Sequence, residues 1–499
     1  MTKRELIRQR LVKWVCGLFS VYWIITLLSV LCLERETLIW KRGYAGNNLL
    51  PMLAALAMLA VLGRIAASGM GRSLERMPEK RFFALLAAAS LAVLAVQMTC
   101  LTQIDKQLGM DFMYVRDAAG SIGLHHTMVH AWYFNKYPNN QPITFLFAML
   151  MRVFGKWSVV TAGGVLLINL SVLLTAQMAC RLSGSRRIGL FTFAVGVLLV
   201  DFSFRTFVPY TDNSCVFFMV LPLAIMVNGK RGAGWLCLAA ASTALACFIK
   251  ITAAIPLIAG VIMLALVRQP DWRRTLARSA LFVCVLVCTF GALTVCKDGC
   301  FRDAGFVKNT RGGVGAWHYF MMGQNDEHWG AYLEDDVRTS MGFGTQKERD
   351  SANRAEGLRR IRARGLAGNL RFYAYKNDHN YGDGTFAPYQ QTIKADHFGD
   401  SFWEQIMIDG KPYYQHYALA EQALWLLVMC CILCEALLRA EREKPWVFLK
   451  LVILSVSLYL MLFEGSAKYI YMFLPFYLLL AGAGLRALLD RAGGREKQN

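Results

Sequence analysis

Residues 82–120 read FFALLAAASLAVLAVQMTCLTQIDKQLGMDFMYVRDAAG, a hydrophobic run that is followed at once by Asp105, Asp111 and Asp117. The run is long enough to cross a bilayer as one helix. The three carboxylates therefore follow the end of a membrane span, where polar residues reach water. This stretch predicts a membrane protein with acidic groups gathered at one membrane surface.

The composition of the whole chain indicates the same class. Its 499 residues are 56% hydrophobic with a mean hydropathy of +0.37, more apolar surface than soluble domains bury. The net charge is +20, but Lys and Arg fall mostly in short segments between apolar runs, where they set membrane orientation. We expect an all-α polytopic membrane protein and no nucleic-acid partner.

Apolar runs of roughly 16 to 24 residues predict about twelve transmembrane helices. The run 142–154 is too short to span and follows the turn-rich "YPNNQP", so we expect it to lie in the interface. The spans are expected at 11–33, 47–63, 82–103, 157–180, 188–204, 213–228, 234–249, 251–267, 278–296, 419–438, 447–463 and 470–489.

With 142–154 left out of the spans, the basic loops all fall on one side, which the positive-inside rule assigns to the cytoplasm. Both termini are expected there, with an uncleaved first helix. The other side receives the loop 104–156, all eight histidines and the polar segment 297–418. The 14 cysteines lie nearly all within apolar spans and are expected to be free thiols.

Four regions follow from this topology. Residues 1–81 hold two additional N-terminal spans, 82–296 a transmembrane core with the outer loop 104–156, 297–418 a small mixed α/β or α extracytoplasmic domain, and 419–499 the last spans. Within the outer domain, the arginine-rich stretch 347–373 predicts an amphipathic helix with Leu358, Ile361 and Leu370 toward one side. Its arginines are read either as receptors for an anionic acceptor or as a solvated face.

The acids after the first long run are not equivalent. Asp111 follows Gly109 in the apolar setting "GMDFMYV", where partial desolvation would raise its basicity and suit a general base. The alternative for Asp111 is an N-cap of the next helix. Asp105 is read as a solvated helix-end residue beside Lys106, and Asp117 as a support of the loop.

Further charges mark the outer ends of later spans. Asp212 in "PYTDN" is a second acid, or else Thr211, Asp212 or Asn213 only caps the next helix, and Arg205 precedes them in the same segment. Lys250 interrupts a long apolar stretch, so it marks a turn or binds an anion. Glu464 and Lys468 in "FEGSAKY" form either a binding pair or an i,i+4 pair at a helix start.

Carboxylates and cations at one membrane surface suit an anionic lipid substrate. The cations would hold a phosphate, and a carboxylate would take a proton from an incoming hydroxyl. A nucleotide substrate is not expected, because the chain has no phosphate-binding glycine loop and its cytoplasmic loops are short.

The order of these motifs resembles the GT-C superfamily of polytopic glycosyltransferases, particularly bacterial relatives of protein mannosyltransferases and aminoarabinose transferases. The resemblance runs from about residue 82 onward. It is carried by "GMDFMYVRDAA", "YFNKYPNNQPITFLF" with "FGKW", "PYTDN", "FIKITAAIPL" and "FEGSAKYIYMFLP".

The resemblance implies inverting sugar transfer from a polyprenyl-phosphate carrier to a cell-envelope acceptor on the extracytoplasmic side. It implies Asp111 as the catalytic base, Asp212 as a second acid organising the site, and Lys250 as a contact to the carrier phosphate. The family pattern usually has arginine where this chain has Lys468 before Tyr469, which keeps a cation and loses bidentate geometry. The full set of expected substrate-binding residues is Lys250, Arg205, Glu464, Lys468, Tyr469, Asn139 and Asn140.

Two matters stay open at this point. No residue spacing in the sequence is that of metal ligands, so no metal-binding residue is assigned, although a divalent metal remains an alternative for part of the charge stabilisation. A multi-pass transporter or flippase of a lipid-linked glycan is the rival function, and a non-catalytic scaffold for envelope assembly is a third. Two features argue against the transporter. The two halves of the chain show no paired hydropathy repeat, and the charges lie at span ends instead of mid-span.

Overall fold

The computed structural model describes residues 3–33, 43–44, 46–104, 108–230, 232–266, 271–386, 400–438 and 444–492. These residues form helices and turns without a β-strand, so the described part of 297–418 takes the all-α form of the two that were expected. Asp105 and Lys106 lie outside the described residues.

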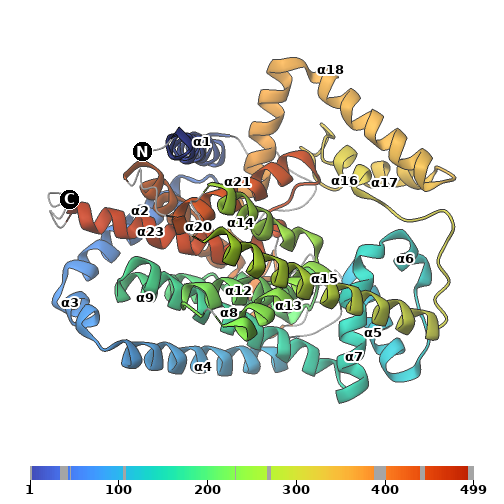
Figure 1. The fold of residues 1–499 in the computed structure, drawn as a ribbon, viewed down its shortest axis with the longest axis horizontal. Coiled ribbons are helices and arrows are strands. Elements are labelled where there is room, and N and C mark those ends of the chain that lie inside the picture. Colours follow the sequence, from blue (N-terminus) through green and yellow to red (C-terminus); the bar gives the residue numbers. More distant parts are fainter. Residues whose placement is uncertain are drawn as a thin grey trace.

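Within the described residues, seven helices are long and apolar enough to cross a membrane. Each matches an expected span, and the helix usually begins several residues earlier because polar flanks continue its hydrogen bonding. Figure 1 shows most of them running along the long axis of the molecule. They are α1 (Lys3–Cys32), α2 (Leu49–Ala67), α4 (Glu79–Gln103), α8 (Trp157–Ser183), α15 (Trp272–Asp303), α20 (Tyr414–Leu438) and α21 (Lys444–Leu462).

The other five expected spans also coincide with helices, but most of these are short. The two shortest have 12 residues each, about 18 Å of helix, against a hydrocarbon thickness of about 30 Å. The number of spans therefore stays a prediction. These helices are α9 (Arg186–Leu198), α12 (Val216–Val227), α13 (Ala233–Ile249), α14 (Ile255–Leu266) and α23 (Leu474–Ala492).

Four of the spans expected to be continuous are broken by short helical pieces, and the expectation is wrong there. Such breaks are tolerated in a membrane only where other groups satisfy the freed backbone. The pieces contact one another at one end of the bundle, as side-chain bonds described below establish. They are α10 (Val200–Phe204) with η2 (Arg205–Phe207), α11 (Thr211–Ser214), η3 (Ile251–Ala254) and α22 (Lys468–Tyr471).

The core of the bundle is built around α23. Its residues from Leu474 to Leu485 are buried, because it is apolar on all sides and is packed by α8, α9, α20 and α21. Gly484 allows the close approach of α20, since a side chain there would overlap the carbonyl oxygen of Cys431. A buried ion pair, Lys450 Nζ to Glu435 Oε1 at 2.9 Å, joins α21 to α20.

The described part of the segment after α15 contains four helices: α16 (Ala316–Met322), α17 (Glu334–Met341), α18 (Gln346–Tyr381) and α19 (Phe402–Met407). α18 bends sharply at Gly365, whose φ of 62° and ψ of −170° suit glycine, so that two arms diverge in Figure 1. Leu358 and Ile361 are half-buried, but Leu370 is 67% exposed, so the expected apolar face is wrong at Leu370.

The second arm of α18 enters the helix bundle, although the whole segment 297–418 was expected to lie outside it. Tyr22 of α1 donates to Asn377 at 2.8 Å, and the Tyr381 hydroxyl lies 2.9 Å from that of Tyr477 in α23. The indole of Trp425 in α20 donates to the Tyr381 carbonyl at 2.7 Å. The segment is thus joined to the bundle by buried polar contacts, which hydropathy does not report.

Candidate functional site

Asp111 lies in the first turn of α5 (Met110–His125), at the end of the bundle opposite the two chain ends (Figure 1). The N-cap position is held by Gly109, so the N-cap alternative for Asp111 is wrong. Met110 adopts φ +49°, an uncommon conformation for a residue with a side chain. Such strained residues cluster at functional sites, where the surrounding structure holds them in place.

Tyrosine hydroxyls surround the Asp111 carboxylate. The Tyr210 hydroxyl lies 3.5 Å from Oδ2 of Asp111 and 3.1 Å from Oδ1 of Asn140, and Tyr133 also bonds the carboxylate. Asn140 in turn donates to the Tyr133 hydroxyl. Burial raises the pKa of Asp111, while the nearby Lys468 ammonium and these hydroxyls oppose the rise without cancelling it.

A second group joins three broken helices. Lys250, which follows the last residue of α13, forms an ion pair with the buried Asp212 of α11. Its ammonium also lies 4.9 Å from the ring centre of Tyr469 in α22. The helix-cap alternative is wrong for Asp212 and is confirmed for Asn213, whose side chain accepts the Tyr210 backbone N–H at 2.9 Å. Lys250 therefore both marks a turn and holds an anionic partner.

Tyr469 connects this group with Lys468, whose charge opposes the rise in the pKa of Asp111. The centre of its ring lies 5.0 Å from the Lys468 ammonium, so two lysine ammonium groups lie near the ring. Its hydroxyl donates to Oε1 of the buried Glu464 at 2.9 Å. Glu464 precedes α22 in a loop and its carboxylate is bonded by Tyr469, so the expected i,i+4 pair with Lys468 at a helix start is wrong.

Two expected site residues have other surroundings. The Arg205 guanidinium donates to the carbonyl of Phe386 and lies 5.6 Å from the ring of Tyr471, so it joins η2 to α22 and to the outer segment. Asn139, in η1 (Pro138–Asn140), is exposed, and its amide lies 3.5 Å from Oδ1 of Asn140. Asn140 is buried among the site tyrosines, whereas Asn139 lies at the edge of this group.

Asp117 is in the supporting position that was expected. Its carboxylate pairs with Arg116 at 3.0 Å and lies 3.6 Å from His130, both on or just after α5. It lies six residues along the same helix from Asp111 and faces a different direction. Because Asp117 shares the helix with Asp111 but faces a different direction, it is a useful control for any test of Asp111.

Of the tyrosines of the site, sequence reasoning found Tyr469 and missed the others. Tyr133 on α6 (Ala131–Lys136) and Tyr210 both lie inside motifs that were already noted, "YFNKYPNN" and "PYTDN". Tyr319 of α16 and Tyr137 face the same acids, since Asp111 and Glu464 both raise the pKa of each hydroxyl, after burial as the larger cause. The recurrence of tyrosine beside each acid was the available signal.

The arginines of α18 are largely occupied within their own segment. Arg360 pairs with Asp336 at 2.6 Å, Arg359 with Glu356 at 2.6 Å, and the fully buried Arg349 donates to the Gly313 carbonyl at 2.8 Å. These three arginines therefore do not form a surface that receives an anionic acceptor.

A divalent metal finds no ligand set in the described part of the chain, where no three His, Cys, Asp or Glu side chains gather to hold an ion. Asp212 is engaged by a lysine and Asp111 by tyrosine hydroxyls, which are poor surroundings for a cation. We assign no chemical step to a metal.

Comparison with known proteins places the chain among membrane proteins. The family model described as "Conserved hypothetical integral membrane protein" matches residues 8–487. A search of curated proteins gave no match.

Two crystal structures of ArnT from Cupriavidus metallidurans are similar to the chain. The one bound to undecaprenyl phosphate has 15% identity and a TM-score of 0.33, covering 84% of this chain and 79% of that chain. The apo structure has 16% identity and a TM-score of 0.34, covering 81% and 77%.

Proposed function

This chain belongs to the family of conserved hypothetical integral membrane proteins, and we propose that it is a membrane glycosyltransferase. We propose that it acts on a lipid-linked sugar at the Asp111 end of its helix bundle. The donor is a sugar on a polyprenyl phosphate, and the acceptor is a hydroxyl-bearing cell-envelope molecule. The proposed active site faces the extracytoplasmic side, with both chain ends in the cytoplasm. Figure 1 supports this orientation, since both ends lie opposite α5 and α6.

One observation carries the proposal: a buried carboxylate of raised pKa lies beside a lysine that shares a tyrosine ring with a second lysine. Asp111 is the carboxylate, and Lys468 and Lys250 flank Tyr469 at 5.0 and 4.9 Å. A base and two cations in one site are what a displacement at a phosphate-linked carbon requires.

In the proposed reaction, the acceptor oxygen attacks the anomeric carbon while its proton passes to Asp111. The new carbon–oxygen bond forms as the bond to the phosphate oxygen breaks, and the polyprenyl phosphate leaves with the electron pair. Lys250 and Lys468 stabilise the charge on the departing phosphate, and Asp212 orients Lys250. A single displacement inverts the anomeric configuration and needs no covalent enzyme intermediate.

The test uses purified protein in detergent, with radiolabelled polyprenyl-phosphate hexoses and pentoses as donors and a total membrane extract as acceptor. We expect Asp111→Asn to lower transfer by roughly 10²- to 10⁴-fold, the usual contribution of a general base. Asp117→Asn, on the same helix, should retain transfer. Full transfer by Asp111→Asn would overturn the mechanism. Movement of the lipid-linked sugar across vesicles without transfer would favour a flippase.

A further inference from the structure

The end of α21 is held by side chains of the segment that follows α15. Lys376, on the second arm of α18, is fully buried and donates to the carbonyls of Phe463 at 2.7 Å, Met461 at 3.1 Å and Gly323. An ammonium has three protons to donate, so its hydrogen-bonding capacity is filled. The last carbonyls of a helix lack intrahelical partners and carry the negative end of its dipole, which favours a cation here.

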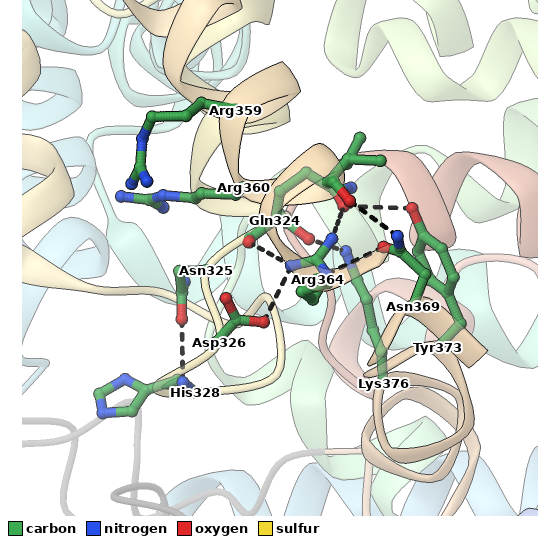
Figure 2. Close-up of polar contacts among 12 residues, drawn as sticks. Gln324, Asn325, Asp326, His328, Arg359, Arg360, Arg364, Asn369, Tyr373 and Lys376 are labelled. Carbon is green, nitrogen blue, oxygen red and sulfur yellow. Dashed lines mark hydrogen bonds and ion pairs between the residues drawn. The ribbon is translucent and has the colours of Figure 1, made fainter. Parts of the chain in front are cut away.

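Gln324 holds the same helix end from a second direction. Its amide nitrogen donates to the carbonyls of Leu462 at 3.0 Å and Met461 at 3.2 Å. Its amide oxygen accepts from Arg364 at 2.8 Å and from the Tyr373 hydroxyl at 3.1 Å. Figure 2 shows Arg364 between Gln324, Asp326 and Asn369, so the amide is itself fixed in orientation.

The backbone beyond α21 is fixed by the same segment. The Glu464 N–H donates to the Tyr319 carbonyl and the Gly465 N–H to the Gly330 carbonyl, both at 2.9 Å. The His379 ring lies 3.1 Å from the Gly465 carbonyl oxygen. A side chain at Gly465 would lie 2.5 Å from Oδ1 of Asn380, so that side chain would have to move to admit another residue. Each contact holds the turn that carries Glu464 into α22.

We propose that Lys376 and Gln324 are positioning residues for the donor-phosphate site: they fix the turn 461–469, so that Glu464 holds Tyr469 between Lys250 and Lys468. Neither residue touches the substrate. The assignment of that site as the donor-phosphate site rests on the proposed function. The base Asp111 lies on α5, outside this turn, and its carboxylate is bonded by Tyr210 and Tyr133, so the clamp acts on donor binding more than on proton transfer.

Hydrogen exchange tests the clamp without reference to activity. Lys376→Met removes the ammonium at similar length, and Gln324→Leu is a milder change that removes the amide donors. We expect amide exchange of peptides covering 461–470 to quicken about tenfold or more in both variants, as the loss of one or two hydrogen bonds implies. Arg359→Gln, which removes an exposed pair on the first arm of α18, should leave this exchange unchanged. Unchanged exchange in Gln324→Leu would overturn the clamp.

Donor kinetics separate positioning from general stability. We expect the KM for the polyprenyl-phosphate sugar to rise about tenfold in both variants and kcat to change less than about threefold. A variant that merely misfolds loses active protein, which lowers kcat and leaves KM unchanged, and that result would overturn the positioning role. If wild-type protein neither transfers sugar nor binds undecaprenyl phosphate, the proposed function fails. If hydrogen exchange still supports the clamp in that case, Lys376 and Gln324 position the turn 461–469 for a different function.

Discussion

The Tyr210 hydroxyl lies 3.5 Å from Oδ2 of Asp111, although the two residues are 99 positions apart in the chain. A bond at this length is at the upper limit for a hydroxyl donor, and the same hydroxyl lies closer to Asn140, at 3.1 Å. The carboxylate is thus held in place but only weakly stabilised as an anion. That is the condition under which burial keeps the pKa of an acid raised.

The first prediction concerns the pH dependence of transfer. A base must be unprotonated, and burial raises the pKa of Asp111, so kcat/KM should rise with pH through a midpoint above about 3.9, the ordinary Asp value. Tyr210→Phe removes a donor that lowers this pKa, so the midpoint should move to higher pH. Tyr375→Phe, whose ring stacks on Trp329 at 4.4 Å, is the control. A midpoint that stays or falls in Tyr210→Phe would contradict the assignment of the base.

The second prediction concerns stability. A carboxyl group whose folded pKa is raised stabilises the fold below its unfolded pKa and loses that contribution as pH rises through the folded pKa. Asp111→Asn should therefore unfold at a higher temperature than wild type at pH 8, and the difference should vanish below about pH 4. Thermal unfolding in detergent measures this, with Asp117→Asn as the matched variant. If the Asp111→Asn protein were less stable than wild type at pH 8, burial would not be destabilising the Asp111 carboxylate, and this prediction would be wrong.

The third prediction separates the two partners of the Lys250–Asp212 pair. Either single change leaves a charge without its partner and should destabilise by roughly 2–4 kcal/mol, below the fully buried case because 17% of the Lys250 side chain is exposed. The double variant Lys250→Met with Asp212→Asn should recover most of this loss. Chemical unfolding in detergent gives the values.

The two single variants of the Lys250–Asp212 pair should differ in how tightly they bind a phosphate. Lys250→Met should weaken undecaprenyl phosphate binding about tenfold or more, since a charge-assisted contact is lost. Asp212→Asn should bind it at least as tightly as wild type, because the lysine no longer has a competing carboxylate. Equal weakening in both variants would mean that the pair is structural only.

The fourth prediction concerns the buried pair Lys450–Glu435 between α20 and α21. Lys450→Met alone should cost roughly 3–5 kcal/mol, because a buried carboxylate loses its partner. Lys450→Met with Glu435→Leu should lie close to wild type, since both charges are replaced by apolar groups. Sugar transfer by the double variant should be normal, because Glu435 lies near the end of α20 that is remote from Asp111. Loss of transfer in a stable double variant would give the pair a role beyond packing.

Much of the fold could be predicted before the structure. The all-helical membrane class is confirmed, and each of the seven long apolar helices falls on an expected span. Asp212, Lys250, Asp111 and Lys468 were singled out because a charge beside an apolar run is costly wherever the chain goes. The breaks at Leu199, Cys215 and Met472 were missed, since an interrupted helix and a continuous one have the same average hydropathy, whereas the break at Lys250 lies between the expected spans 234–249 and 251–267.

The sequence by itself determined where the apolar helices run and which charged residues lie at their ends, because hydropathy is a property of neighbours in the chain. Only the tertiary structure decided the partners: Asp111 with Tyr210, Lys250 with Asp212, and the end of α21 with Lys376. Each of these contacts joins segments 38 to 99 residues apart. Hydrogen bonds and ion pairs depend on distances of a few ångströms in space, and those distances are set by how the helices pack.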